Sequence, residues 1–186
     1  MAIDFRKNYP LLLIFLGFVF ISFTGGYRIY SQRILSFSTT PKSFQKGDTG
    51  DQNKNIPGRI NIPKVNISLP VDISTIENGV WQISDTRASF LDISAGLGQG
   101  GNTVIYGHNK TSIFGPIRWL KKGDEIELID RAGESHKYEI AETVVVNPDA
   151  IDYVEPKDKE TLTIYTCTGV FDSKRFIIVA YPKEVR

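Results

Sequence analysis

The stretch Thr161-Leu162-Thr163-Ile164-Tyr165-Thr166-Cys167 decides the fold, and it ends on the only cysteine of the chain. Its β-branched and aromatic residues favour an extended strand. Side chains alternate between the two faces of a strand, so Cys167 shares a face with a tyrosine and a threonine, while Leu162 and Ile164 point to the other face. The thiol therefore lies on the less aliphatic side, which favours a cleft over the protein core.

Two further apolar runs carry reactive side chains at their ends. One is Asn102-Thr103-Val104-Ile105-Tyr106-Gly107-His108, which ends on one of two histidines, and the other is Arg175-Phe176-Ile177-Ile178-Val179-Ala180. Both runs predict strands. Side chains at the ends of neighbouring strands can converge at one rim of a sheet. The sequence therefore predicts that Cys167, His108 and Arg175 form one site.

These three side chains suit acyl transfer through a thioester. A thiolate attacks carbonyl carbon far better than a thiol, and a nearby cation lowers the pKa of Cys167. His108 can protonate a leaving amine, because the ordinary pKa of histidine lies near working pH. Arg175 stays charged, so it suits a developing oxyanion or a substrate carbonyl.

Each of the three residues also has a simpler interpretation when it is taken alone. A single cysteine in an apolar strand is usually a small buried hydrophobe. A single histidine or arginine at a strand end is usually a solvated surface residue. The shared context of Cys167, His108 and Arg175 favours the catalytic interpretation over these.

Composition narrows the class of protein. The chain has 186 residues, of which 41% are apolar and 23% charged, which is typical of one globular domain with its own core. The formal net charge is +1 and there is no block of like charges, which argues against a nucleic-acid partner. One cysteine excludes an internal disulfide and cysteine-based zinc sites.

The amino-terminal region predicts a membrane anchor. Residues 9–27 carry no charge, and roughly 19 residues at about 1.5 Å each span about 28 Å, close to the thickness of bilayer hydrocarbon. Basic residues flank this segment on both sides, and long domains translocate largely regardless of charge. We expect a single-pass protein of the cell membrane, with its amino terminus in the cytoplasm and its domain outside. A cleaved signal peptide and a buried helix are the alternatives.

The rest of the chain divides at changes of composition. We expect a cytoplasmic tail at 1–8, a transmembrane helix at 9–27, a flexible stalk at 28–55 and a catalytic domain at 56–186. The stalk is rich in serine, threonine, glycine and aspartate, and it holds too few large apolar residues to build a core.

The domain is predicted to be mostly β, because many short alternating runs are separated by turns. The predicted strands are Arg59–Ile62, Asn66–Val71, Thr103–Tyr106, Glu125–Asp130, His136–Val146, Thr161–Cys167 and Phe176–Tyr181. A helical spacing predicts a short helix at Ser112–Leu120, and one or two helical turns are one interpretation of Ile73–Trp81. Asn147–Asp158 is predicted to be a loop with one helical turn.

The reactive residues and their neighbours resemble the sortase family, the membrane-anchored cysteine transpeptidases of bacterial surfaces. The family's T-L-x-T-C motif reads Thr163-Ile164-Tyr165-Thr166-Cys167 here, with isoleucine for leucine. The histidine context N-T-x-I-x-G-H matches residues 102–108, and the family's arginine matches Arg175. Similar stretches occur at 59–64 and 120–124, so the resemblance covers about 57–181.

The resemblance implies an eight-stranded sortase-type β-barrel with short helices. It implies that the enzyme cleaves an LPXTG-like, carboxy-terminal sorting signal on surface proteins, forms a thioester at Cys167 and passes the acyl group to an amine of a cell-wall precursor or a pilin. His108 would be the acid and base, and Arg175 would steady the oxyanion or the substrate. Thr166 and Thr168, beside the thiol, would add substrate or oxyanion contacts.

The resemblance leaves subclass and acceptor open. The sequence is similar to the A, D and E classes, and it shows no second hydrophobic segment after Tyr181, which pilus-building sortases often have. No cofactor is expected; a calcium site, as in some relatives, would draw on Asp149, Asp152 and Glu155. A thiol hydrolase that uses water, and a catalytically idle surface-binding module, are the alternative functions. His136 and the two tryptophans are interpreted as structural.

Overall fold

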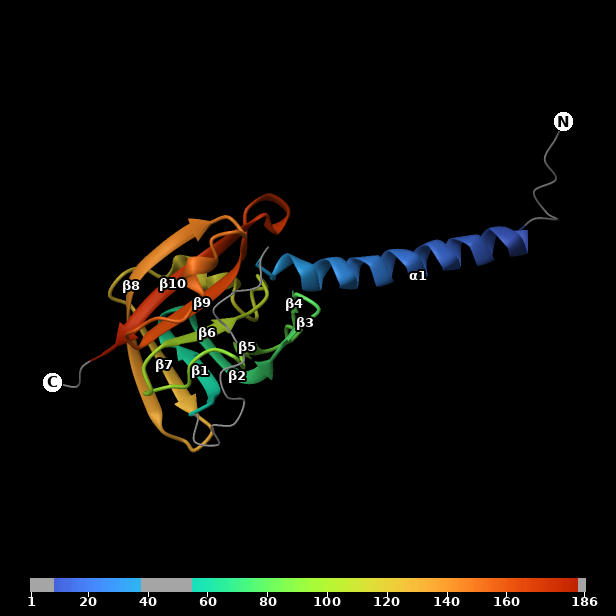
Figure 1. The fold of residues 1–186 in the computed structure, drawn as a ribbon. Coiled ribbons are helices and arrows are strands. Elements are labelled where there is room, and N and C mark those ends of the chain that lie inside the picture. Colours follow the sequence, from blue (N-terminus) through green and yellow to red (C-terminus); the bar gives the residue numbers. More distant parts are fainter. Residues whose placement is uncertain (1–8, 38–54, 184–186) are drawn as a thin grey trace.

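The computed structural model describes residues 9–37 and 55–183, and these form one long helix and a closed β-barrel (Figure 1). The predicted tail at 1–8 and the part of the predicted stalk at 38–54 lie outside the described residues. The helices are α1 (Tyr9–Ile34) and the short 3₁₀ helices η1 (Pro63–Val65), η2 (Gly115–Trp119), η3 (Ile151–Tyr153) and η4 (Val170–Asp172). The strands are β1 (Pro57–Ile62), β2 (Ile67–Ser74), β3 (Ile76–Glu77), β4 (Val80–Trp81), β5 (Ala88–Leu91), β6 (Asn102–Tyr106), β7 (Glu125–Asp130), β8 (Ser135–Val146), β9 (Thr161–Thr168) and β10 (Lys174–Pro182).

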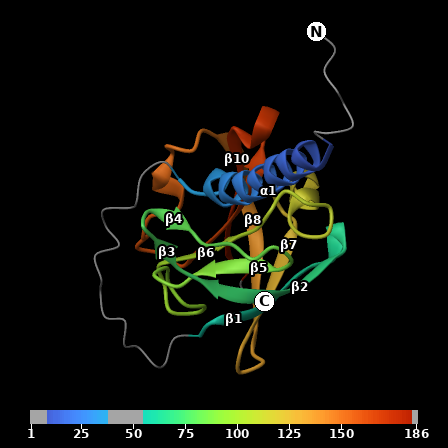
Figure 2. The same ribbon diagram turned by 90° about the vertical axis from the view of Figure 1, so that its right-hand side faces the viewer.

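Eight of these strands close the barrel in the order β1-β2-β5-β6-β9-β10-β8-β7, which confirms the predicted eight-stranded barrel. Figure 2 views it from the side on which α1 leaves. Most neighbours are antiparallel, but β2 pairs with β5 and β6 pairs with β9 in parallel. Strand β9 is therefore central, with β6 on one side and β10 on the other. Its first seven residues are all buried, which explains why its sequence is so apolar.

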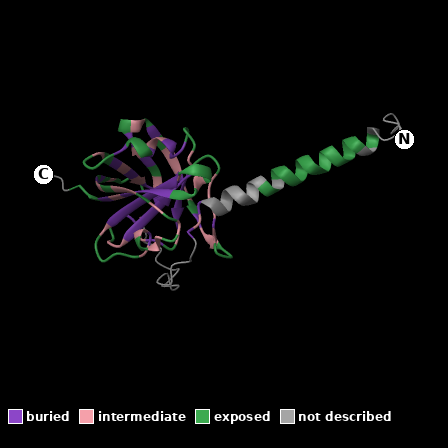
Figure 3. Ribbon diagram, turned by 90° about the horizontal axis from the view of Figure 1, so that it is seen from above, coloured by how far each residue is buried: buried purple, intermediate pink, exposed green. Residues whose placement is uncertain are grey.

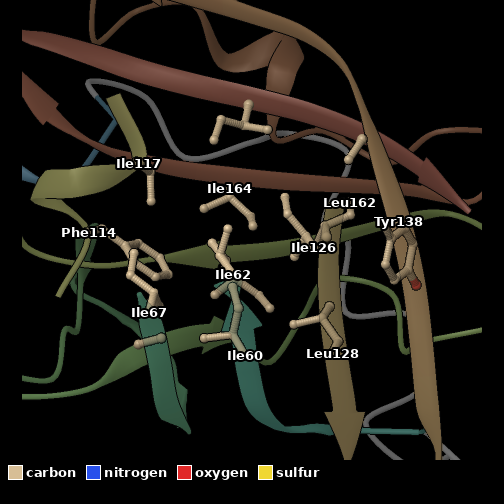
Figure 4. Packing of buried hydrophobic residues seen from close by; sticks show 14 of the residues in the cluster. Ile60, Ile62, Ile67, Phe114, Ile117, Ile126, Leu128, Tyr138, Leu162 and Ile164 are labelled. Carbon is tan, nitrogen blue, oxygen red and sulfur yellow. The ribbon is translucent and has the colours of Figure 1, made fainter. Parts of the chain in front are cut away.

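The barrel interior is filled by the alternate residues that point inward from each strand. Ile60 and Ile62 of β1 and Leu162 and Ile164 of β9 all lie in one buried apolar cluster (Figure 4). The neighbouring residues on β9 point outward instead, so Tyr165 and Cys167 belong to a second cluster on the other face of the strand. The barrel thus has an inner core and an apolar outer face over β6, β9 and β10.

The inner core gives a stability prediction at Ile164, which is fully buried. We expect Ile164→Ala to lower the free energy of unfolding by about 2–5 kcal/mol, because the substitution leaves a cavity among packed side chains. The same substitution at Ile73, which is 41% exposed, should cost far less. Chemical denaturation of both variants measures the difference, and equal losses would contradict the assigned core.

Two local predictions need correction, and one strand was not predicted. The interpretation of Ile73–Trp81 as helical turns is wrong, because β2 runs to Ser74 and β3 and β4 pair as a hairpin. Asn78 and Gly79 form its turn with φ of 51° and 75°, a conformation that Asn-Gly sequences favour. The helix predicted at Ser112–Leu120 is only the 3₁₀ turn η2. Strand β5 was not predicted, because all four of its residues are buried and show no alternation.

Helix α1 projects from the barrel, and its described side chains are exposed (Figure 3). The exposed large apolar residues on it are Leu12, Leu13, Ile14, Phe15, Leu16, Phe18, Val19, Phe20, Ile21 and Phe23. Judged on the residues that the structure describes, no helix reaches the combined length and apolarity of a membrane-crossing segment.

The helix continues past Tyr27 to Ile34, into the region predicted as a stalk. Leu35 and Phe37, which follow it directly, are 1% and 3% exposed and pack on the barrel's outer face. Residues 28–37 of the predicted stalk therefore form the end of α1 and a short buried segment.

Candidate active site

The sheet register brings the three predicted catalytic residues to one rim of the barrel. Cys167 on β9 and Arg175 on β10 are directly opposite partners in the antiparallel ladder. On the other side of β9, Tyr106 of β6 is the parallel partner of Tyr165, and the Gly107 N–H donates to the Tyr165 carbonyl at 3.3 Å. Because β6 and β9 are parallel, His108 leaves its strand at the end where Cys167 lies. The thiol therefore stands on the strand between those that lead to the imidazole and the guanidinium.

Gly107 and Thr166 fix the backbone that carries His108. The Thr166 hydroxyl donates to the Gly107 carbonyl at 2.7 Å, which ties the end of β9 to the residue before the histidine. A Cβ on Gly107 would lie 2.9 Å from the Phe114 ring, so only glycine fits there. Thr166 is fully buried, and its observed hydroxyl bond is structural. A contact from Thr166 to substrate stays a prediction, as does one from the half-buried Thr168.

His108 sits among groups of both charges. Its Nε2 atom is buried, has no hydrogen-bond partner among the described residues and lies 3.6 Å from Oδ1 of Asp85. Burial lowers the pKa of His108, and the nearby Lys110 lowers it further, while Asp85 and Asp172 act in the opposite direction. The net effect favours the neutral imidazole, with Asp85 as one of the two groups that stabilise the charged form.

Asp85 therefore gives a pH prediction. In Asp85→Asn the pKa of His108 should fall further, because one of the two groups that raise it is lost. The His108 titration in an NMR experiment should shift to lower pH, and so should the acid limb of any pH–rate profile that His108 controls. Asp158→Asn, at the far end of β9, is the matched control, and an equal shift in that variant would contradict a local effect of Asp85.

Cys167 is only 2% exposed. Burial raises the pKa of its thiol to about 12; Arg175 lowers it and Asp172 raises it. The neutral thiol therefore dominates in this conformation. Exposure of Cys167 to water would weaken the effect of burial, which is the largest of the three. Arg175 would then be the group that favours the thiolate.

Arg175 is also 2% exposed, and its guanidinium donates to three carbonyl groups. Nη1 donates to Asp172 at 3.1 Å and to Lys174 at 3.0 Å, both in its own loop and strand. Nη2 donates at 2.8 Å to the carbonyl of Ser36, from the segment after α1. The bonds to Asp172 and Lys174 hold the side chain in place, and the bond to Ser36 reaches a peptide carbonyl of a segment distant in sequence.

The outer-face cluster surrounds the thiol with large apolar side chains. Its buried members are Leu35, Phe37, Trp81, Leu91, Val104, Tyr106, Val154, Tyr165, Cys167 and Ile177. The rings of Tyr106 and Tyr165 stack at 5.2 Å, and the ring of Trp81 meets that of Tyr106 edge-on at 5.6 Å. The predicted structural role of Trp81 agrees with its complete burial, whereas Trp119 is 77% exposed.

Residues Ser36, Phe37 and Asp85 were not predicted at the site. The alternation of Leu35-Ser36-Phe37, with two apolar residues around a serine, is a weak strand-like signal that could have indicated burial of this segment. Asp85 offers no such signal, since it lies in a loop and reaches His108 only through the fold.

In the described residues, the ligand atoms of Asp149, Asp152 and Glu155, the acids considered for calcium, do not all lie within 4.8 Å of one another. In the part of the chain that the structure describes, the group of three or more potential ligands with mutually close atoms is Asp130, Glu134 and His136, at the turn between β7 and β8. There Asp130 accepts a hydrogen bond from the Glu134 N–H at 2.8 Å and lies 3.3 Å from Nε2 of His136. These contacts organise the turn and place His136 in a structural role.

The barrel holds Cys167 and Arg175 on the neighbouring strands β9 and β10, and His108 follows the end of β6 on the other side of β9. This arrangement is that of a thiol enzyme. The sortase-domain family profile matches residues 60–183, and the chain belongs to the sortase family.

The chain is similar to sortase A of Bacillus anthracis, with 36% identity over 129 residues, 67% of this chain and 59% of that protein. It is also similar to sortase A of Listeria monocytogenes, with 27% identity over 141 residues, 74% of this chain and 61% of that protein. The matched part thus spans about three fifths of these relatives. Among solved structures, sortase C-1 of Actinomyces oris shares the fold with a TM-score of 0.56 and 26% identity, covering 68% of this chain and 73% of that one.

Proposed function

We propose that this protein is a cysteine transpeptidase that cleaves an LPXTG-like sorting signal and transfers the acyl group to an amine. The observation that carries the proposal is the position of Cys167 between the strands that lead to His108 and Arg175. Membership of the sortase family supports it. The substrates would be surface proteins with carboxy-terminal sorting signals, and the acceptor would be an amine of a peptidoglycan precursor or a pilin.

The first half of the reaction forms the thioester. His108 takes the proton of the Cys167 thiol, and the sulfur attacks the carbonyl carbon of the threonine in the signal. The guanidinium of Arg175 stabilises the oxyanion of the tetrahedral intermediate. When the intermediate collapses, the carbon–nitrogen bond breaks, and the His108 imidazolium gives its proton to the leaving amine. The acyl group then remains on sulfur.

The second half reverses these roles. The acceptor amine attacks the thioester carbon, His108 takes a proton from that amine, and the carbon–sulfur bond breaks. Cys167 leaves as a thiolate and recovers a proton from His108. Because burial raises the thiol pKa and lowers the imidazole pKa, the neutral pair dominates at rest and the reactive ion pair is a minority. The rate therefore depends on how far substrate binding shifts this balance.

The proposal is tested with the full chain in detergent and a peptide that contains the LPXTG motif. Mass spectrometry should find the acyl fragment on Cys167, and added triglycine should convert it into a transfer product. Hydrolysed peptide alone, whatever amine is offered, would support a thiol hydrolase instead. No adduct from any peptide varied around the motif would contradict the enzyme and leave a binding module.

We also propose that α1 attaches the protein to the cell membrane through residues 9–27, with residues 1–8 in the cytoplasm and the barrel outside. The exposed apolar side chains from Leu12 to Phe23 support this, since water contact with so many of them is unfavourable. Protein made in cells should stay in the membrane pellet after an alkaline wash. External protease should then digest the barrel of intact cells from which the wall has been removed. Release by the wash, or full protection of the barrel, would contradict the proposed arrangement.

A further inference from the structure

We propose that the barrel itself rests on the membrane, with the side chains of Trp119, Val170 and Phe171, here called the apolar tips, inserted among the lipid headgroups. The inference rests on the proposed function, because it takes residues 9–27 of α1 to lie in the bilayer. It goes further by assigning a lipid-binding surface to the barrel, beside the site that holds Cys167.

Helix α1 leaves little room between the bilayer and the barrel. It runs without interruption to Ile34, and Leu35 and Phe37 are already buried against the barrel. The part of α1 beyond the proposed span, residues 28–34, covers roughly 10 Å at about 1.5 Å per residue. The headgroup layer on each side of the hydrocarbon is about 5–8 Å thick. The end of the barrel that α1 joins is therefore held at the lipid surface, and a side chain that projects from it reaches the headgroups.

The apolar tips are the most exposed large apolar side chains of the described part of the barrel. Trp119 is 77% exposed, Val170 is 76% exposed and Phe171 is 85% exposed. The other exposed large apolar side chains of the described barrel lie between 39% and 55%. Contact of such large side chains with water is unfavourable, and an exposed apolar surface of this kind marks a contact with a membrane or a partner.

The apolar tips lie on two adjoining loops at the end of the barrel that α1 joins. One loop holds η4, between β9 and β10, and the other holds η2. The side chain of Asn109, before η2, donates to Oδ1 of Asp172 at 3.5 Å, which connects the two loops. Arg175 donates both to the carbonyl of Asp172 and to that of Ser36, just after α1. In Figure 2, which faces α1, both loops accordingly lie beside the helix.

The backbone of Phe171 also points to a contact outside the fold. Its φ and ψ are 52° and 36°, in the left-handed region that bulky residues rarely adopt, and the next residue, Asp172, has a φ of 56°. The ring gains little burial against the described residues in return for this conformation. Insertion of the ring into lipid supplies the apolar contact that the fold does not.

The charges around Trp119 suit a layer of anionic headgroups. Three exposed basic side chains lie within three residues of it, namely Arg118, Lys121 and Lys122. The next acid along the chain, Asp124, is paired with Lys64 at 2.6 Å. Lysine and arginine are attracted to anionic lipid, and tryptophan is enriched at the level of the headgroups. An apolar tip with a basic surround therefore fits a lipid surface.

Fluorescence quenching by brominated lipid tests the contact. The full chain is reconstituted into vesicles of phosphatidylcholine and phosphatidylglycerol, with or without bromine near the headgroup end of the acyl chains. The chain has two tryptophans, and Trp81 is fully buried in the barrel. Bromine should therefore quench the wild type through Trp119, and Trp119→Phe should lose that quenching.

Two variants built on Trp119→Phe move the fluorescent reporter. Phe171→Trp places it on the other loop and should restore quenching. Tyr181→Trp is the matched control, because Tyr181 is 47% exposed on β10 at the end of the barrel away from α1 (Figure 1), and it should not be quenched. An unchanged melting temperature in these exposed-site variants would show that the fold is intact.

Flotation of the vesicles separates the outcomes. Protein that does not float with them would contradict both the membrane attachment of α1 and this inference. Flotation without quenching at either Trp119 or Phe171→Trp would overturn this inference alone. Equal quenching of Tyr181→Trp would overturn it as well, because no face of the barrel would then be preferred. Cleavage of the LPXTG peptide is measured on the same samples, and quenching without cleavage would keep the lipid surface and contradict the transpeptidase.

Discussion

Cys167→Ala should eliminate both the acyl adduct and peptide cleavage, with kcat/KM reduced by at least about 10³-fold. The cysteine is the only thiol of the chain, so no other cysteine can take its place. Stability should change little, because the thiol is a small side chain on the outer face and not part of the barrel interior. Mass spectrometry with the peptide measures the first effect, and thermal melting measures the second.

Cys167→Ser is the companion variant, since it keeps nearly the same shape. A hydroxyl in this buried position loses its proton far less readily than a thiol, so this variant should be as inactive as the alanine variant. Cleavage by either variant at more than about one per cent of the wild-type rate would mean that water is activated elsewhere. The proposed thioester route would then be wrong, and His108 would be the first residue to examine as a direct base.

The buried state of the site opposes reaction in this conformation. Cys167 is neutral and covered, His108 is neutral, and Arg175 is bound to the carbonyl of Ser36. Substrate binding therefore has to supply the free energy that brings the thiol into contact with the peptide, and that requirement restricts reaction to peptides that fit the outer face well.

Much of the barrel was predictable, because its strands are regular and short. The alternation in β1 and the apolar run of β9 indicate which side chains are buried. The turns between strands contain the usual glycines and prolines. Strand β5 was not predictable in this way, since Ala88–Leu91 is buried on both faces and too short to show a period. The β3–β4 hairpin was predictable in principle, because Asn78-Gly79 is a strong turn signal.

The site was predictable only where residues lie at strand ends. Cys167, His108 and Arg175 each end or begin an apolar run, and adjacency of β6, β9 and β10 follows once the barrel is known. The alternation of Leu35-Ser36-Phe37 could at most have indicated burial of this segment. Its partners Trp81 and Tyr165 could not be predicted, because they lie far from it in sequence and these contacts depend on tertiary structure.

Arg175→Lys is expected to show that the planar guanidinium is required in addition to its charge. Lysine keeps the positive charge but has one ammonium group in place of a planar fork, so it cannot reproduce bonds to Asp172, Lys174 and Ser36 together. Transpeptidation should fall by about 10²-fold or more in kcat/KM, since the oxyanion loses an oriented donor. Arg59→Lys, at an exposed position of β1, is the matched control and should leave kcat/KM unchanged. An unchanged melting temperature of Arg175→Lys would show that the loss does not come from unfolding. If Arg175→Lys kept more than about a third of the wild-type kcat/KM, the charge alone would suffice, and the proposed role of Arg175 as an oriented donor would be wrong.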